Sequence, residues 1–165
     1  MPRLTAMPVG MRLSHPVAFI ATWFGSGLLP KAPGTWGTLA ALPIAYVIAM
    51  TGGVNALIPA AIVAFLIGTW ASGAYAAASA KPDPSEVVID EVAAIWLVLA
   101  FTPFAIIWWV IAFAAFRLFD VVKPWPVSLA DAKLKGGFGI MFDDTIAAIY
   151  AMLSLQILIY FVEAI

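Results

Sequence analysis

Six apolar stretches follow one another along this chain, and they leave room for only one kind of fold. The stretches are Val17–Leu29, Thr38–Met50, Val54–Ala80, Val92–Phe101, Phe104–Phe119 and Ile146–Val162. Of all residues, 64% are hydrophobic and 10% are charged, whereas a soluble domain has about 25% charged residues. We therefore predict an all-α, polytopic membrane helical bundle with short spans, formed by a single integral-membrane domain over residues 1–165.

A break at Phe101-Thr102-Pro103 divides the longest apolar region into two short pieces. Proline cannot donate a backbone hydrogen bond, and the residue before it is disfavoured in the helical region. The break therefore predicts a helical hairpin near Pro103, with one long kinked helix as the alternative.

Two other stretches differ in how well they fit a bilayer. Val54–Ala80 is long enough to span, since a span takes about 20 residues. Its small residues, such as Gly68 and Gly73, recur near helical spacing and favour close helix packing in lipid. Val17–Leu29 is short and interrupted by glycine, so we expect an interfacial or re-entrant segment there.

The basic residues predict the orientation of the bundle. Lysine and arginine near span ends favour the cytoplasm. With the N-terminus inside, all basic residues lie at or near the inner face: Arg3, Arg12, Lys31, Lys81, Arg117, Lys123, Lys133 and Lys135. The same multi-pass arrangement places three acidic clusters inside: Asp90-Glu91, Asp120 and Asp143-Asp144.

These acidic clusters are the main functional signal. Carboxylates in or beside a bilayer are costly and are rarely placed there without a function. Carboxylates that converge next to lysines suggest a divalent cation that holds a phosphate. Simpler roles exist for some of them, since acids at a helix start complement the helix dipole and Arg117 can pair with Asp120 on one helix face. Because neighbouring acids point in different directions on a helix, we expect only one of Asp143 and Asp144 to face the shared site.

Two glycine-rich segments complete the set of motifs. In Phe24–Pro43 we expect an irregular loop, with Thr35 or Thr38 as the cap of the following helix. The free backbone N–H groups of such a loop could cradle a phosphate, although a plain helix-start turn is the alternative. Gly136-Gly137 and Gly139 are expected to form a flexible approach to the next helix, and the segment before them a solvated loop.

Missing residues exclude phosphatases that use a cysteine, a histidine pair or an Asp-x-Asp pair, and they exclude nucleic-acid binding. The chain has no cysteine and one histidine, His15, which lies outside the acidic clusters. It also lacks an Asp-x-Asp pair and a basic stripe that would bind nucleic acid. A carboxylate-held metal acting on a phosphate remains. A carboxylate-based cation or proton-coupled transporter and a lipid-binding scaffold are the alternatives.

Four blocks in order resemble the phosphatidylglycerophosphatase A family of bacterial inner-membrane lipid phosphatases. The blocks are Pro30-Lys-Ala-Pro33-Gly34-Thr35-Trp-Gly37-Thr38, Asp90-Glu91, Phe116 to Pro126, and Gly136 to Asp144. The resemblance implies Mg²⁺-dependent removal of the terminal phosphate from phosphatidylglycerophosphate at the cytoplasmic membrane face, giving phosphatidylglycerol.

This resemblance and the residue pattern together give the expected site. The expected Mg²⁺ ligands are Asp90, Glu91, Asp120 and Asp143 or Asp144, and the expected catalytic residues are these five carboxylates with Lys123. The expected phosphate-binding residues are Lys31, Gly34, Thr35, Gly37, Thr38, Arg117 and Lys123. Attack by water and attack by an aspartate both remain open, as does the oligomeric state.

Overall fold

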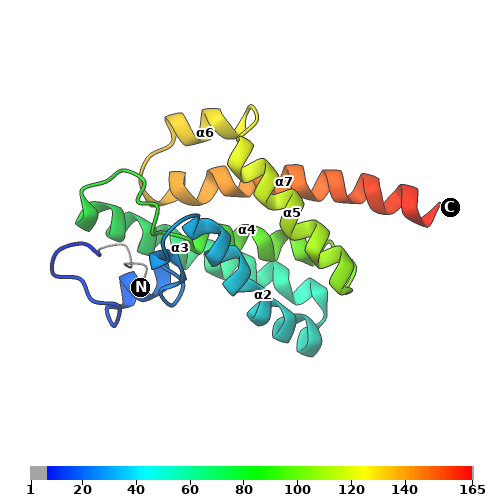
Figure 1. The fold of residues 1–165 in the computed structure, drawn as a ribbon, viewed down its shortest axis with the longest axis horizontal. Coiled ribbons are helices and arrows are strands. Elements are labelled where there is room, and N and C mark those ends of the chain that lie inside the picture. The colour runs from blue at the N-terminus through cyan, green and yellow to red at the C-terminus, as the bar shows by residue number, and fades with distance from the viewer. Residues whose placement is uncertain (1–6, 165) are drawn as a thin grey trace.

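The computed structural model describes residues 7–164, and every regular element in that range is helical. In chain order the elements are α1 (Pro16–Ala21), η1 (Ser26–Leu28), α2 (Pro33–Gly52), η2 (Val54–Ala56), α3 (Leu57–Ser79), α4 (Ile89–Ala100), α5 (Ile106–Val122), α6 (Val127–Lys133) and α7 (Gly136–Glu163). They form one elongated bundle (Figure 1). The all-α prediction is confirmed.

Three helical segments are long and apolar enough to cross a membrane. They are Pro33–Gly52, Val54–Ser79 and Gly136–Glu163. By contrast α1 has six residues, about 9 Å of helix, which is too short to span. Its buried residues Val17, Ala18 and Ala21 belong to the common core, and the helix packs against α3.

The predicted hairpin near Pro103 is confirmed. Helix α4 ends at Ala100, and α5 begins at Ile106 and runs back along the bundle (Figure 1). Although α4 has only 12 residues, nearly all of them are buried, and it packs against α2, α3 and α7. A helix that is apolar all round belongs inside a bundle, and α4 is the central helix here.

Five helix ends meet at one end of the bundle and position the functional residues. The starts of α2, α4 and α7 lie there together with the ends of α3 and α5 (Figure 1). Local sequence explains these ends: Pro33 occupies the first turn of α2, which suits a residue without an N–H. Helix α5 stops at Lys123, whose φ is 45° and which precedes Pro124.

Glycines allow α3 and α7 to pack closely, as the small residues of α3 predicted. A Cβ on Gly68 would press against the Met141 side chain of α7. A Cβ on Gly137 would overlap the carbonyl oxygen of Thr69 and the amide of Gly73 in α3. Backbone atoms have little freedom to move away, so the approach of these two helices depends on Gly137.

Replacement of Gly137 by alanine is therefore expected to lower the free energy of unfolding by about 1–3 kcal/mol, the usual cost of overpacking. Gly73→Ala provides a matched comparison, because its Cβ would meet Gly137 at 3.3 and 3.5 Å and the strain is smaller. Reversible unfolding of the purified protein in detergent measures both changes. Equal stability of wild type and Gly137→Ala would contradict this account of the α3–α7 contact.

Three local predictions were wrong. Helix α2 begins at Pro33 and has Ala32 as an N-cap without a side-chain hydrogen bond, so neither Thr35 nor Thr38 caps it. The glycines expected as a flexible approach form the first turns of α7, and the expected solvated loop contains α6. Glycine weakens an isolated helix, but tertiary packing stabilises these turns.

Candidate active site

A polar pocket of about 640 Å³ opens where the five helix ends meet. Its walls come from α2, α4, α5, α6 and α7 and from the segment that joins α3 to α4. All five predicted carboxylates line it: Asp90, Glu91, Asp120, Asp143 and Asp144. The predicted convergence of the three acidic clusters is thus confirmed, whereas their catalytic roles remain predictions.

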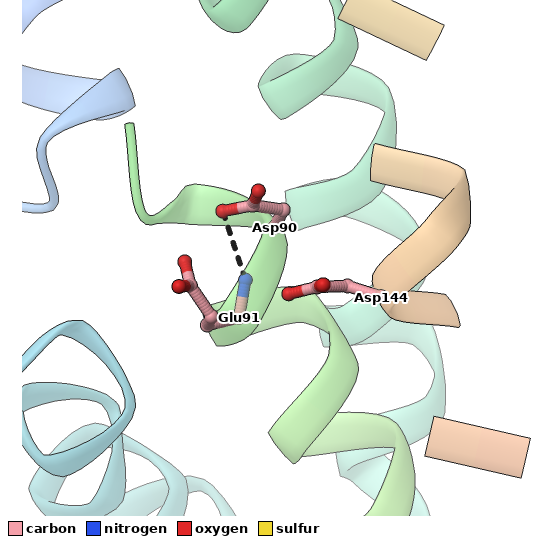
Figure 2. Close-up of side chains that lie close together, drawn as sticks. All are labelled: Asp90, Glu91 and Asp144. Atoms are coloured by element: carbon pink, nitrogen blue, oxygen red, sulfur yellow. Dashed lines mark hydrogen bonds between the residues drawn. The ribbon is translucent and has the colours of Figure 1, made fainter. Parts of the chain in front are cut away.

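Three of these carboxylates form a compact group from two helices. Asp90 and Glu91 come from the first turn of α4, and Asp144 approaches them from α7 (Figure 2). One oxygen atom of each lies within 4.8 Å of the corresponding oxygens of the other two. The Glu91 amide donates a hydrogen bond of 3.0 Å to Asp90 Oδ1, which fixes Asp90 relative to its neighbour.

The donor set of this group fits a hard divalent cation. Oxygens Glu91 Oε2 and Asp144 Oδ2 are buried and accept no hydrogen bond from the described residues. A buried acceptor without a partner carries a desolvation cost of about 1–3 kcal/mol or more, and like charges this close repel. Carboxylate oxygens are the ligands that Mg²⁺ and Ca²⁺ prefer, so a bound cation would remove both costs.

Arg117 links a fourth carboxylate to this group. Its Nη1 lies 2.5 Å from Asp120 Oδ2 and 3.6 Å from Glu91 Oε1. The predicted pair of Arg117 with Asp120, one turn apart on α5, is confirmed. The guanidinium thus stands between two carboxylates on the wall of the pocket, with a side chain that is 15% exposed.

Lys123 forms the second ion pair of the pocket. Its Nζ lies 2.8 Å from Asp143 Oδ2, and its side chain is 30% exposed. The expectation that only one of Asp143 and Asp144 faces the site was wrong, because both line the pocket. They differ in what they contact, since Asp143 pairs with Lys123 and Asp144 joins Asp90 and Glu91.

Only one residue of the predicted phosphate cradle reaches the pocket. Gly34 lines it, whereas Lys31, Thr35, Gly37 and Thr38 do not. Inside a helix the amides of Gly37 and Thr38 bond to carbonyls four residues earlier, and the Thr38 hydroxyl also donates to Gly34 O at 2.8 Å. The glycines serve close packing on α4 instead, because a Cβ would overlap Glu91 Oε1 at Gly34 and the Val88 side chain at Gly37.

The sequence did not reveal the segment between α3 and α4 as part of the site. Residues 82–85 and Val87 line the pocket. Glu86 is only 2% exposed, and its Oε1 lies 3.4 Å from Lys81 Nζ at the base of the segment. The Lys81-Pro-Asp-Pro84 sequence is typical of a turn, and the predicted topology places it on the cytoplasmic side of the membrane. The burial of Glu86, however, has no local sequence signal.

Comparisons with known proteins agree with this geometry. The sequence profile of the family described as Phosphatidylglycerophosphatase A matches residues 19–159. A Haemophilus influenzae protein named Phosphatidylglycerophosphatase A is 38% identical over 142 residues, which are 86% of this chain and 87% of that protein. An Escherichia coli protein of the same name is 35% identical over 141 residues, 84% of this chain and 81% of that protein.

A third relative carries a different name. A Bacteroides thetaiotaomicron protein, provisionally named a phosphatidylinositol-3-phosphatase, is 37% identical over 145 residues, 84% of this chain and 90% of that protein. No solved structure matches the chain. The match to the family profile, over residues 19–159, extends over the helices that form the pocket.

Proposed function

The chain belongs to the phosphatidylglycerophosphatase A family and is a phosphoric monoester hydrolase with membrane-type helices, and we propose that its substrate is phosphatidylglycerophosphate. One observation carries this proposal: three carboxylates from α4 and α7 converge beside Arg117 and Lys123 in a single pocket. Carboxylates suited to a cation, next to two cationic side chains, can bind a phosphate monoester. The pocket lies at the end of apolar helices, where the headgroup of a membrane lipid is located.

The cofactor proposed for this pocket is Mg²⁺, with Asp90, Glu91 and Asp144 as its protein ligands. When bound, Mg²⁺ supplies positive charge to the phosphoryl oxygens and makes a bound water more acidic. Asp120 and Asp143 were also predicted as ligands from the sequence. Asp120 instead contacts Arg117, and Asp143 contacts Lys123. Their proposed role is to orient those two cations.

Arg117 and Lys123 are the proposed phosphate-binding side chains. Arg117 lies near the end of α5 and Lys123 directly follows that helix, and each is held by a carboxylate before substrate binds. Charged groups that are already oriented stabilise the charge that develops on a transferring phosphoryl group, without reorganising at the moment of reaction. Positioning and charge are the main contributions a protein makes to this chemistry.

The proposed location is the bacterial inner membrane, with the pocket on the cytoplasmic side. Three of the described lysines flank helix ends on the pocket side: Lys31 precedes α2, Lys81 follows α3, and Lys123 follows α5. The turns at the other end, residues 51–56 and 101–105, contain no charged residue. This asymmetry matches the cytoplasmic bias of lysine and arginine; Arg3, the first basic residue, lies outside the described range.

The test is phosphate release from phosphatidylglycerophosphate by the purified protein in detergent, with Mg²⁺, after EDTA, and after Mg²⁺ is restored. We expect EDTA to abolish release and Mg²⁺ to restore it. Phosphatidylinositol-3-phosphate is the comparison substrate, because one relative is named for it, and we expect slower release from it.

Two outcomes would contradict parts of the proposal. Release that EDTA does not affect would exclude the metal site of Asp90, Glu91 and Asp144. A folded protein that releases no phosphate from this lipid with Mg²⁺ would contradict the proposed substrate. The transporter alternative has no support here, because the family is one of phosphatases and the five carboxylates of the site lie at one end of the bundle.

A further inference from the structure

A second groove, which is apolar, lies between α2 and α5. It has a volume of about 500 Å³ and is lined by residues that include Leu39, Leu42 and Tyr46 from α2 and Trp109, Val110 and Phe113 from α5. Its far end is closed by an aromatic group: the Tyr46 ring lies 5.3 Å from Phe104 and 6.3 Å from Trp109, centroid to centroid. The groove therefore has an open side and a definite end.

Both helices that line this groove also contribute residues to the polar pocket. Helix α2 contributes Gly34 to the pocket and Leu39 to the groove, five residues later, or about 7.5 Å along the helix. Helix α5 contributes Phe113 to the groove and Arg117 to the pocket, four residues or about 6 Å apart. The groove thus starts one to two helical turns below the carboxylates and runs toward the opposite end of the bundle.

We propose that this groove binds one acyl chain of the lipid whose phosphate occupies the polar pocket, an inference that rests on the proposed function. A lipid lies with its headgroup at one end of the spans and its chains parallel to them. A phosphate beside Arg117 therefore places a chain next to α2 and α5. The groove offers this chain apolar walls and an aromatic end, and the pocket offers cations to the headgroup.

The advantage of the groove is orientation rather than transfer out of water. The bilayer is as apolar as the groove, so no hydrophobic free energy is gained when the chain moves between them. Many weak dispersion contacts with fitted walls can nevertheless hold the chain in one position. A fixed chain restricts where the phosphate lies relative to the carboxylates, and such positioning contributes strongly to rate.

Another apolar groove, lined by α3, α4 and α7, is separate from the helix that carries Arg117. It has a volume of about 360 Å³, and Ile62, Leu66 and Phe142 are among its lining residues. Its α4 and α7 walls also belong to helices that line the polar pocket, but no residue of α2 or of α5, the helix that carries Arg117, lines this groove. This groove therefore serves as the internal control for general effects on the lipid-facing surface.

The test compares a tryptophan placed in each groove. Val110 is 58% exposed and lines the α2–α5 groove, whereas Leu66 is 64% exposed and lines the other one. Val110→Trp and Leu39→Trp fill the proposed chain site from its two walls, and Leu66→Trp is the matched control. Phosphate release is measured in detergent with Mg²⁺ for dioleoyl and dihexanoyl phosphatidylglycerophosphate, at equal amounts of folded protein.

We expect the ratio of kcat/KM for the dioleoyl lipid to kcat/KM for the dihexanoyl lipid to fall about tenfold in Val110→Trp and Leu39→Trp. Leu66→Trp should keep the wild-type ratio. If the wild type acts on the dioleoyl lipid alone, the dioleoyl kcat/KM of the Val110 and Leu66 variants is compared instead. If Val110→Trp does not fold, Leu39→Trp carries the test.

Three results would overturn the inference: an unchanged ratio, an equal loss for both lipids, or an equal loss in Leu66→Trp. Failure of the proposed function gives a different result, because the wild type would then release no phosphate from either lipid. The two failures are therefore distinguishable in the same experiment.

Discussion

Replacement of Asp144 by asparagine is expected to slow phosphate release from phosphatidylglycerophosphate by about a hundredfold to a thousandfold, the scale of losing one preorganised electrostatic group. Asparagine has nearly the same shape, so α7 is kept, while one charge of the Asp90-Glu91-Asp144 group is removed. Cation binding should weaken, which a smaller Mg²⁺-dependent rise in unfolding temperature would show. Without Mg²⁺ the variant should be at least as stable as wild type, because repulsion between buried carboxylates is reduced.

Asp143→Asn is the matched control for this prediction. Asp143 neighbours Asp144 and lines the same pocket, but it pairs with Lys123 and is not one of the three grouped carboxylates. We expect a smaller loss of activity, about tenfold, which is the lower end of the usual range of losses for a residue that orients another group. The stabilisation by Mg²⁺ should be unchanged. Equal losses of both activity and Mg²⁺ stabilisation in the two variants would contradict the division of roles between these aspartates.

Gly34→Ala is expected to lower kcat/KM by about a hundredfold, although it adds only one methyl group. The new Cβ would overlap Glu91 Oε1 and come within 3.0 Å of Arg117 Nη1. Glu91 would have to move, which separates it from Asp90 and Asp144, and a displacement of about 1 Å at a reacting centre can cost that much. Steady-state phosphate release, with the amount of folded protein measured in parallel, tests this expectation.

Gly37→Ala separates this effect from general disturbance of the α2–α4 contact. Gly37 lies one turn later on α2, is also buried, and faces the Val88 side chain rather than a carboxylate. Its replacement should lower stability by about 1–3 kcal/mol, while activity per folded molecule stays near the wild-type value. If both variants lose activity equally, the spacing of the two helices matters in general, and the specific displacement of Glu91 is excluded.

The broad fold was predictable because its signals are local. The length of Val54–Ala80 and the proline at position 103 specify a long span and a hairpin without reference to the rest of the chain. Helix starts were less predictable: the glycines at positions 34, 37, 136 and 137 suggested loops, because glycine is a poor helix former in isolation. In the folded bundle they lie within helices. Gly34, Gly37 and Gly137 let α2 and α7 approach their neighbours, whereas a Cβ on Gly136 would have no neighbour within 4 Å.

The candidate site was also predictable only in part. The sequence alone predicted that the three acidic clusters and the basic residues gather at one end of the bundle, because charges are excluded from the apolar spans and the order of spans assigns their ends. It could not show that Asp144 meets Asp90 and Glu91 while Asp143 meets Lys123, nor that Glu86 is buried. Those contacts depend on how each helix is rotated about its axis. That rotation is set by close packing between distant segments, such as Gly137 against Thr69 and Gly73, and therefore exists only in the tertiary structure.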